Sequence, residues 1–182
     1  MLKNIKPEIA YRLINHGPVA LITTSDKKGK PNVMTLAWTT VVNSEPPIIA
    51  IAMGEQAYSQ KLIKETKEFV INIPDKKLMK KVLYCGSISG KNIDKIKKAG
   101  LTQISSIKIK SPKIKECFAH IECKVINKFK FSDVMLFISK IIYADIEESA
   151  WADDEVLNTD KIKTIHHLGG GWFAEIGKRF KN

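Results

Sequence analysis

One short segment, Asn32 to Val42, combines side chains that could contact a flat, partly polar ligand. It holds an asparagine, three threonines, a methionine and a tryptophan. Because it follows the turn Asp26–Pro31 and the apolar run Val19–Thr24, the sequence predicts a β-hairpin here. One face of such a strand can fill a core while the other presents hydroxyl, amide and indole groups. An ordinary strand is the simpler alternative, since Thr and Trp are common in strands.

A second segment, Gly86-Ser-Ile-Ser-Gly90-Lys91-Asn92, could hold a phosphate group. Its glycines are one residue too close for a P-loop, and Asn92 replaces the magnesium-binding Ser or Thr, which argues against a nucleoside triphosphatase. Serine hydroxyls, free backbone amides, a helix N-terminus and Lys91 or Lys95 would still suit a smaller phosphate. Ser59, near the start of the preceding helix, could add a hydroxyl. The alternative is that Ser89 only caps a helix.

A third segment, Gly169-Gly-Gly-Trp172, lets the backbone pass close to a flat ligand or a partner chain. It is not a dinucleotide-binding motif, because Ala174 stands where the third glycine is needed. A flexible turn is the alternative.

Other candidate sites are weaker. His166 and His167 are adjacent, so an extended chain would point them to opposite sides, and no metal site is predicted. The acidic triplet Asp153–Glu155 lacks the spacing of a calcium loop. Cys85 could be a reactive thiol or a buried bystander. No Ser-His-Asp set or carboxylate pair is present, so we predict no catalytic acid, base or nucleophile.

Composition indicates one soluble domain spanning residues 1–182. The formal net charge is +11, from 30 Lys+Arg and 19 Asp+Glu. A basic surface can attract phosphate-bearing molecules or nucleic acid, but no nucleic-acid motif is present. No signal peptide or membrane-spanning segment is expected, and the three cysteines do not suggest a disulfide framework. We therefore expect a cytoplasmic protein.

Hydrophobic periodicity predicts more strands than helices, without regular alternation. The expected helices are Pro7–Asn15, Tyr58–Thr66, Lys76–Leu83 and Asn92–Ala99. Beyond the hairpin, the expected strands are Ile48–Met53, Phe69–Ile73, Gln103–Ile109, Ala119–Ile126, Leu136–Ile146 and a short piece at His166–Leu168. This pattern predicts a mainly β protein, a closed antiparallel barrel with peripheral helices.

The order of these segments resembles the flavin reductase-like, FMN-binding split-barrel family, which includes flavoredoxin and ferric or flavin reductases. The resemblance rests on Pro31–Trp38, Pro46-Pro47, Gly54…Tyr58-Ser59, Asn72-Ile73-Pro74, Cys85–Lys91…Asp94-Lys95, Glu122-Cys123 and Leu168–Gly171. It implies a six-stranded Greek-key split barrel, a homodimer, and FMN bound near the dimer interface.

The resemblance also implies roles for individual residues. The flavin ring would be lined by Asn32, Met34, Thr35, Trp38 and Thr39. The ribityl phosphate would be held by Tyr58, Ser59, Ser89, Gly90, Lys91 and Lys95. Trp172 would approach the ring. Two positions depart from many relatives, which carry Arg where Ala57 stands and His where Val134 stands.

The resulting functional hypothesis is an FMN-dependent reductase or electron carrier, with NADH or NADPH as electron donor and a small molecule or a protein as acceptor. One alternative is an electron-transfer flavoprotein without a nicotinamide site that serves a protein partner. The other is a basic binding barrel without redox turnover.

Overall fold

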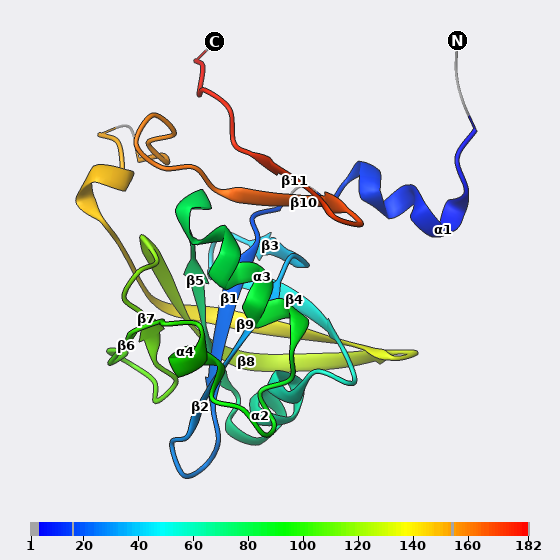
Figure 1. Ribbon diagram of the computed structural model, residues 1–182, viewed down its shortest axis with the longest axis vertical. Helices are drawn as coiled ribbons and strands as arrows, with labels where there is room; N and C mark the ends of the chain where they lie inside the picture. Colours follow the sequence, from blue (N-terminus) through cyan, green and yellow to red (C-terminus); the bar gives the residue numbers. More distant parts are fainter. Residues whose placement is uncertain (1–3, 16, 154, 182) are drawn as a thin grey trace.

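An antiparallel sheet dominates the computed structural model, which describes residues 4–15, 17–153 and 155–181 (Figure 1). The strand order is β2-β1-β5-β8-β9-β4-β3. The strands are β1 Ala20–Ser25, β2 Pro31–Leu36, β3 Thr39–Asn43, β4 Ile48–Gly54, β5 Glu68–Ile73, β8 Ala119–Phe131 and β9 Val134–Ile146. Two small hairpins pair β6 Gln103–Ile104 with β7 Lys113–Ile114, and β10 Ile165–Gly169 with β11 Trp172–Glu175.

The helices lie around this sheet. They are α1 Pro7–Ala10, α2 Tyr58–Thr66, α3 Met79–Ser87 and α4 Lys95–Lys98, with 3₁₀ helices η1 Tyr11–Leu13, η2 Lys76–Leu78 and η3 Glu148–Ala150. The prediction of a mainly β antiparallel fold with few helices is therefore confirmed.

The two ends of the strand order come from one continuous segment of the chain. The predicted strand Asn32–Val42 breaks at Ala37-Trp38, and its two halves, β2 and β3, form opposite edges of the sheet. This bent segment pairs with β1 through β2 and with β4 through β3, so the described sheet has seven strands when its halves are counted separately and six when they are counted as one.

The alternation of side chains along the strands separates two main cores. Ile22 lies opposite Met34, and both pack into the barrel interior with Phe69 and Phe137. Leu21 points to the other side of the same strand. There it packs with Val82 of α3 and Ile96 of α4, which attaches these helices to the outside of β1 and β2.

Residues 105–111 do not form the strand predicted for Gln103–Ile109. Only Gln103 and Ile104 pair, with β7. The amides of Ile107 and Lys108 instead donate to the fully buried Glu122 carboxylate, each at 2.7 Å. The prediction fails because a carboxylate from a distant strand takes these backbone donors.

The structure also bears on the cysteines and on membrane-spanning helices. The cysteines Cys85, Cys117 and Cys123 are free and buried, as expected for thiols that form no disulfide. No described helix is long and apolar enough to cross a membrane. Asp154 of the acidic triplet lies outside the described residues.

Candidate functional site

A cavity of about 270 Å³ lies between β2, the start of α2 and the loop that joins α3 to α4. It collects eight of the twelve residues predicted for the ligand: Asn32, Met34, Thr35, Tyr58, Ser59, Ser89, Gly90 and Lys95. Six further residues line it: Gln56, Ala57, Cys85, Gly86, Ser87 and Ile88. Of these, only Gln56 lies in no segment considered from the sequence.

Strand β2 and helix α2 meet through a hydrogen bond in one wall of the cavity. The buried Asn32 amide donates to the Ser59 hydroxyl at 2.7 Å. Ser59 lies in the first turn of α2, whose apolar residues Leu62 and Ile63 are buried beneath it. Asn32 and Ser59 are therefore fixed by the core of the fold.

Gly90 approaches Asn32 closely. A Cβ atom added to Gly90 would lie 1.8 Å from Oδ1 and 2.9 Å from Cγ of Asn32. No side chain can occupy that space without moving Asn32, so glycine is required for the loop to close this side of the cavity.

Lys95 brings a buried positive charge into the cavity. Its side chain donates to the carbonyl oxygens of Cys85 at 2.7 Å and Ile88 at 3.0 Å. The residue is only 4% exposed, and among the described residues no carboxylate forms an ion pair with it. Burial lowers the pKa of Lys95, and the nearby Cys85 opposes this shift only in part. A buried ammonium group without a counter-charge favours binding of an anion.

Ser89 does not cap a helix. The cap of α4 is Asp94, whose carboxylate accepts from the Lys97 amide at 3.0 Å. Helix α4 has only four residues and its N-terminus is capped by Asp94, so the Lys95 side chain, and not the helix N-terminus, supplies the positive charge in the cavity.

Cys85 lines the same cavity without being an activated thiol. It is fully buried, and burial raises its pKa above the ordinary value, although Lys95 and Lys81 act in the opposite direction. The thiol therefore stays protonated at neutral pH, which favours the bystander alternative.

Four predicted residues lie outside this cavity. Trp38 and Thr39 line a second hollow of about 460 Å³, with Tyr11 and Leu136. Tyr11 packs edge-on against Trp38, with 5.9 Å between ring centroids. Trp172 is 77% exposed on β11, and Lys91 is exposed in the loop before α4. The twelve predicted ligand residues thus divide into eight that line one cavity and four that lie outside it.

Ala57 and Val134, the two positions that depart from the family pattern, lie in different parts of the structure. Ala57 lines the cavity, at the position preceding Tyr58. Val134 pairs with Gly54 and Phe131 at the end of the β8–β9 hairpin and is not a lining residue. Only the replacement at position 57 therefore changes the cavity wall.

Fold and cavity together define a split β-barrel with a cavity beside β2 that contains the buried Lys95 side chain. The model of the flavin reductase like domain family matches residues 12–166, so the chain belongs to this family.

Among curated relatives, an uncharacterized protein of Archaeoglobus fulgidus is 40% identical over 114 residues. That match covers 63% of this chain and 64% of the relative, just under two thirds of its length. The uncharacterized protein YddH of Escherichia coli is 32% identical over 178 residues, covering 93% of this chain and 92% of the relative.

Solved structures agree with the fold. The flavoredoxin of Desulfovibrio vulgaris is 27% identical, with a TM-score of 0.89 over 100% of this chain and 97% of that chain. The flavoredoxin of Methanosarcina acetivorans is also 27% identical, with a TM-score of 0.87 over 100% and 95% of the two chains. The expected resemblance to this family and the split-barrel fold are confirmed.

Proposed function

We propose that the protein binds FMN and acts as an NAD(P)H-dependent flavin or ferric reductase, or as an electron carrier. The observation that carries this proposal is the buried Lys95 ammonium, which has no carboxylate partner among the described residues and lies beside Asn32, Ser59 and Gly90 in one cavity. A phosphate monoester would supply the missing charge.

The residues present fit FMN. Lys95, Ser59 and Ser89 would hold the phosphate, with the Gly90 backbone closing over it. Met34 and Thr35 would support the isoalloxazine ring along β2, towards Trp38. Thr35 is itself fixed, because its hydroxyl donates to the Val82 carbonyl of α3.

FMN would supply the redox chemistry, accepting hydride from a nicotinamide and passing electrons on. The chain would bind and orient the cofactor and exclude water from the buried part of the cavity. No side chain is assigned as general acid or base. The family membership and the two flavoredoxin structures support a redox role.

The first test is the absorption spectrum of the purified protein, and of the protein loaded with FMN and desalted. Bound FMN with a spectrum shifted from that of free FMN supports the proposal. A colourless protein that retains no FMN contradicts it and favours the non-redox binding barrel.

The electron donor is tested by anaerobic mixing of the FMN-loaded protein with NADH or NADPH. Rapid bleaching of the flavin absorbance is the expected result for a reductase. Bleaching only with dithionite would favour the electron-transfer flavoprotein without a nicotinamide site.

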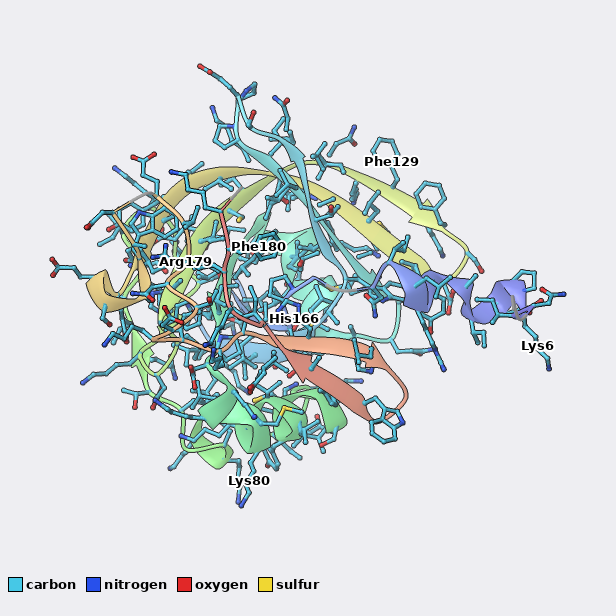
Figure 2. All side chains as sticks on the ribbon, turned by 90° about the horizontal axis from the view of Figure 1, so that it is seen from above. Lys6, Lys80, Phe129, His166, Arg179 and Phe180 are labelled. Atoms are coloured by element: carbon cyan, nitrogen blue, oxygen red, sulfur yellow. The ribbon has the colours of Figure 1, made fainter. Side chains whose placement is uncertain are left out.

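We also propose a homodimer, formed over the outer face of β8, β9 and β4. Across these strands Phe129 lies opposite Leu136 and Leu136 lies opposite Ala52, so the three side chains share one face. Trp38, just before β3, lies next to Ala52, because the Ala52 amide donates to the Trp38 carbonyl. Phe129 is 46% and Trp38 44% exposed. Figure 2 shows Phe129 at the outer rim of the molecule. A continuous exposed apolar surface of this kind favours protein association.

The N-terminal arm also exposes apolar side chains. Residues 5–14 extend away from the sheet (Figure 1) and expose Ile5, Ile9, Tyr11, Leu13 and Ile14. An exposed apolar arm next to an exposed apolar sheet face supports exchange of arms between two copies. In such a dimer the second hollow, beside Trp38 and Thr39, would be covered by the partner.

A further inference from the structure

The positive charge of the chain is concentrated in one segment. Residues 75–116 contain 12 of the 30 Lys+Arg residues but only 3 of the 19 Asp+Glu residues. The remainder of the chain is therefore nearly balanced in charge. This segment also includes α3, α4 and the loop that walls the candidate cofactor cavity.

The lysines of η2, α3 and α4 form a surface that we call the lysine face, composed of Lys77, Lys80, Lys81, Lys97 and Lys98. All are exposed except Lys81, which is partly buried and donates to the Gly100 carbonyl, tying α3 to the end of α4. Figure 2 shows Lys80 extending from α3 into solvent. Among the described residues, none of the five forms an ion pair.

The lysine face reaches the cavity along one side of α3. Lys80, Leu83 and Ser87 recur at helical spacing and are exposed, while Val82 and Cys85 face the core. Ser87 lines the cavity. Since a helix rises 1.5 Å per residue, the backbone of Lys80 lies roughly 10 Å from that of Ser87 along the axis.

Exposed apolar side chains occur in the same part of the chain, in α3 and just before α4. Leu83 is 48% and Ile93 41% exposed. An apolar centre surrounded by charged residues is the usual composition of a protein interface. Residues 75–116 are all described, and none of their aromatic side chains is exposed. Stacking platforms for single-stranded nucleic acid are therefore absent from this surface.

We infer that the lysine face is the docking surface for an acidic redox protein that exchanges electrons at the adjacent cavity. This inference rests on the proposed FMN function and names the partner class. The partner's carboxylates would lie against Lys80, Lys97 and Lys98, and its apolar contact would be made with Leu83. Long-range attraction between opposite charges would orient the two proteins before contact.

Two haem proteins of opposite charge serve as probes, the acidic cytochrome b5 and the basic cytochrome c. Equilibrium binding of each to the protein without FMN is measured at low and high salt. The expected result is salt-sensitive binding of cytochrome b5 and none of cytochrome c. Lys80→Glu with Lys97→Glu should weaken cytochrome b5 binding at least about tenfold. The matched control, Lys27→Glu with Lys28→Glu in the exposed β1–β2 turn, should change it less than about twofold.

A second readout uses the FMN-loaded, photoreduced protein. Two haem irons each accept one electron, from Fe(III) to Fe(II), per reduced FMN, whose protons pass to solvent. Reduction of cytochrome b5 should slow in the lysine-face variant and stay unchanged in the control. If the protein retains no FMN, the proposed function fails, while the binding measurement still tests the surface.

Three results would overturn the inference. They are equal binding of both cytochromes, unchanged binding in the lysine-face variant, and tighter binding of a labelled oligonucleotide that this variant alone abolishes. The last would assign the surface to nucleic acid. Thermal unfolding of each variant checks its fold, and Lys80→Ala with Lys97→Ala provides a milder variant with the same expected direction.

Discussion

At the scale of single residues, Gly90 and Asn32 decide whether the loop before α4 can close over the cavity. The distance of 1.8 Å between an added Cβ and Asn32 Oδ1 is far below any real contact. Asn32 would have to move, and its hydrogen bond to Ser59 would be lost. The cavity therefore depends on the absence of a side chain as much as on the polar groups around it.

Gly90→Ala should weaken FMN binding at least about tenfold, or about 1.4 kcal/mol. The measurement is fluorescence titration of FMN. The control is Gly54→Ala, at the end of β4, where an added Cβ meets no atom within 4 Å. Equal FMN affinity of Gly90→Ala and the wild type would show that the loop is not part of the binding site.

Lys95→Met should distinguish binding of the FMN phosphate from binding of the isoalloxazine ring. Methionine keeps the length and apolar contacts of the lysine stem but removes the charge that would meet a phosphate. FMN binding should weaken by about 1.5–3 kcal/mol, whereas binding of riboflavin, which has no phosphate, should change little. If both ligands lost the same affinity, Lys95 would have a structural role only.

At the scale of elements, Asp145 joins three strands outside the barrel. This residue of β9 accepts from Lys113 of β7 and from His120 of β8, the latter at 2.7 Å. Burial raises the pKa of Asp145, but the hydrogen bonds from Lys113 and His120 outweigh this effect and hold the pKa below the ordinary value of 3.8. The carboxylate form is therefore favoured by the native packing.

The folded protein should lose this stabilisation in acid. Because the folded-state pKa lies below the unfolded value, the contribution is present above about pH 4 and disappears as pH falls through the folded pKa. Urea unfolding at pH 3 and pH 6 should show a smaller difference in Asp145→Asn than in the wild type. The control, Asp133→Asn in the exposed β8–β9 turn, should keep the wild-type difference.

The elements also show where sequence reasoning succeeds. Helix α2 was predicted with its observed bounds, Tyr58–Thr66, because breakers flank an amphipathic pattern. The strand predicted over Gln103–Ile109 was wrong because the carboxylates of Glu122 and Glu68 accept from the amides of residues 107, 108, 110 and 111. Such captures depend on side chains far away in the sequence, so local patterns do not reveal them.

In the candidate site too, local sequence segments could be predicted, but long-range arrangement could not. Except for Gln56, its lining residues come from short segments that composition or the family resemblance had already indicated. The break at Ala37-Trp38 could not be predicted, because it is imposed where the sheet splits and β2 and β3 become opposite edges. That break is what separates Trp38 and Thr39 from the cavity that contains Met34 and Thr35.

At the scale of the whole molecule, the exposed apolar sheet face predicts self-association. Phe129→Asp should shift the protein from twice the mass of the 20.5 kDa chain towards a single chain, as measured by sedimentation equilibrium. A charge at this position opposes burial of the surface between two copies. The control, Ile107→Asp, changes a residue that is 59% exposed in another loop. A wild-type protein that is monomeric at all concentrations would contradict the dimer.

Lys95 has a consequence for the rigidity of the molecule. Its ammonium group already bridges the last turn of α3 to α4 through the carbonyls of Cys85 and Ile88, so one of its three donors remains for a ligand. An anion at that donor would fasten both helices at once. Amide hydrogen exchange across residues 85–98 should slow when the cavity fills, so that the loaded protein presents a stiffer basic surface to its surroundings than the empty one.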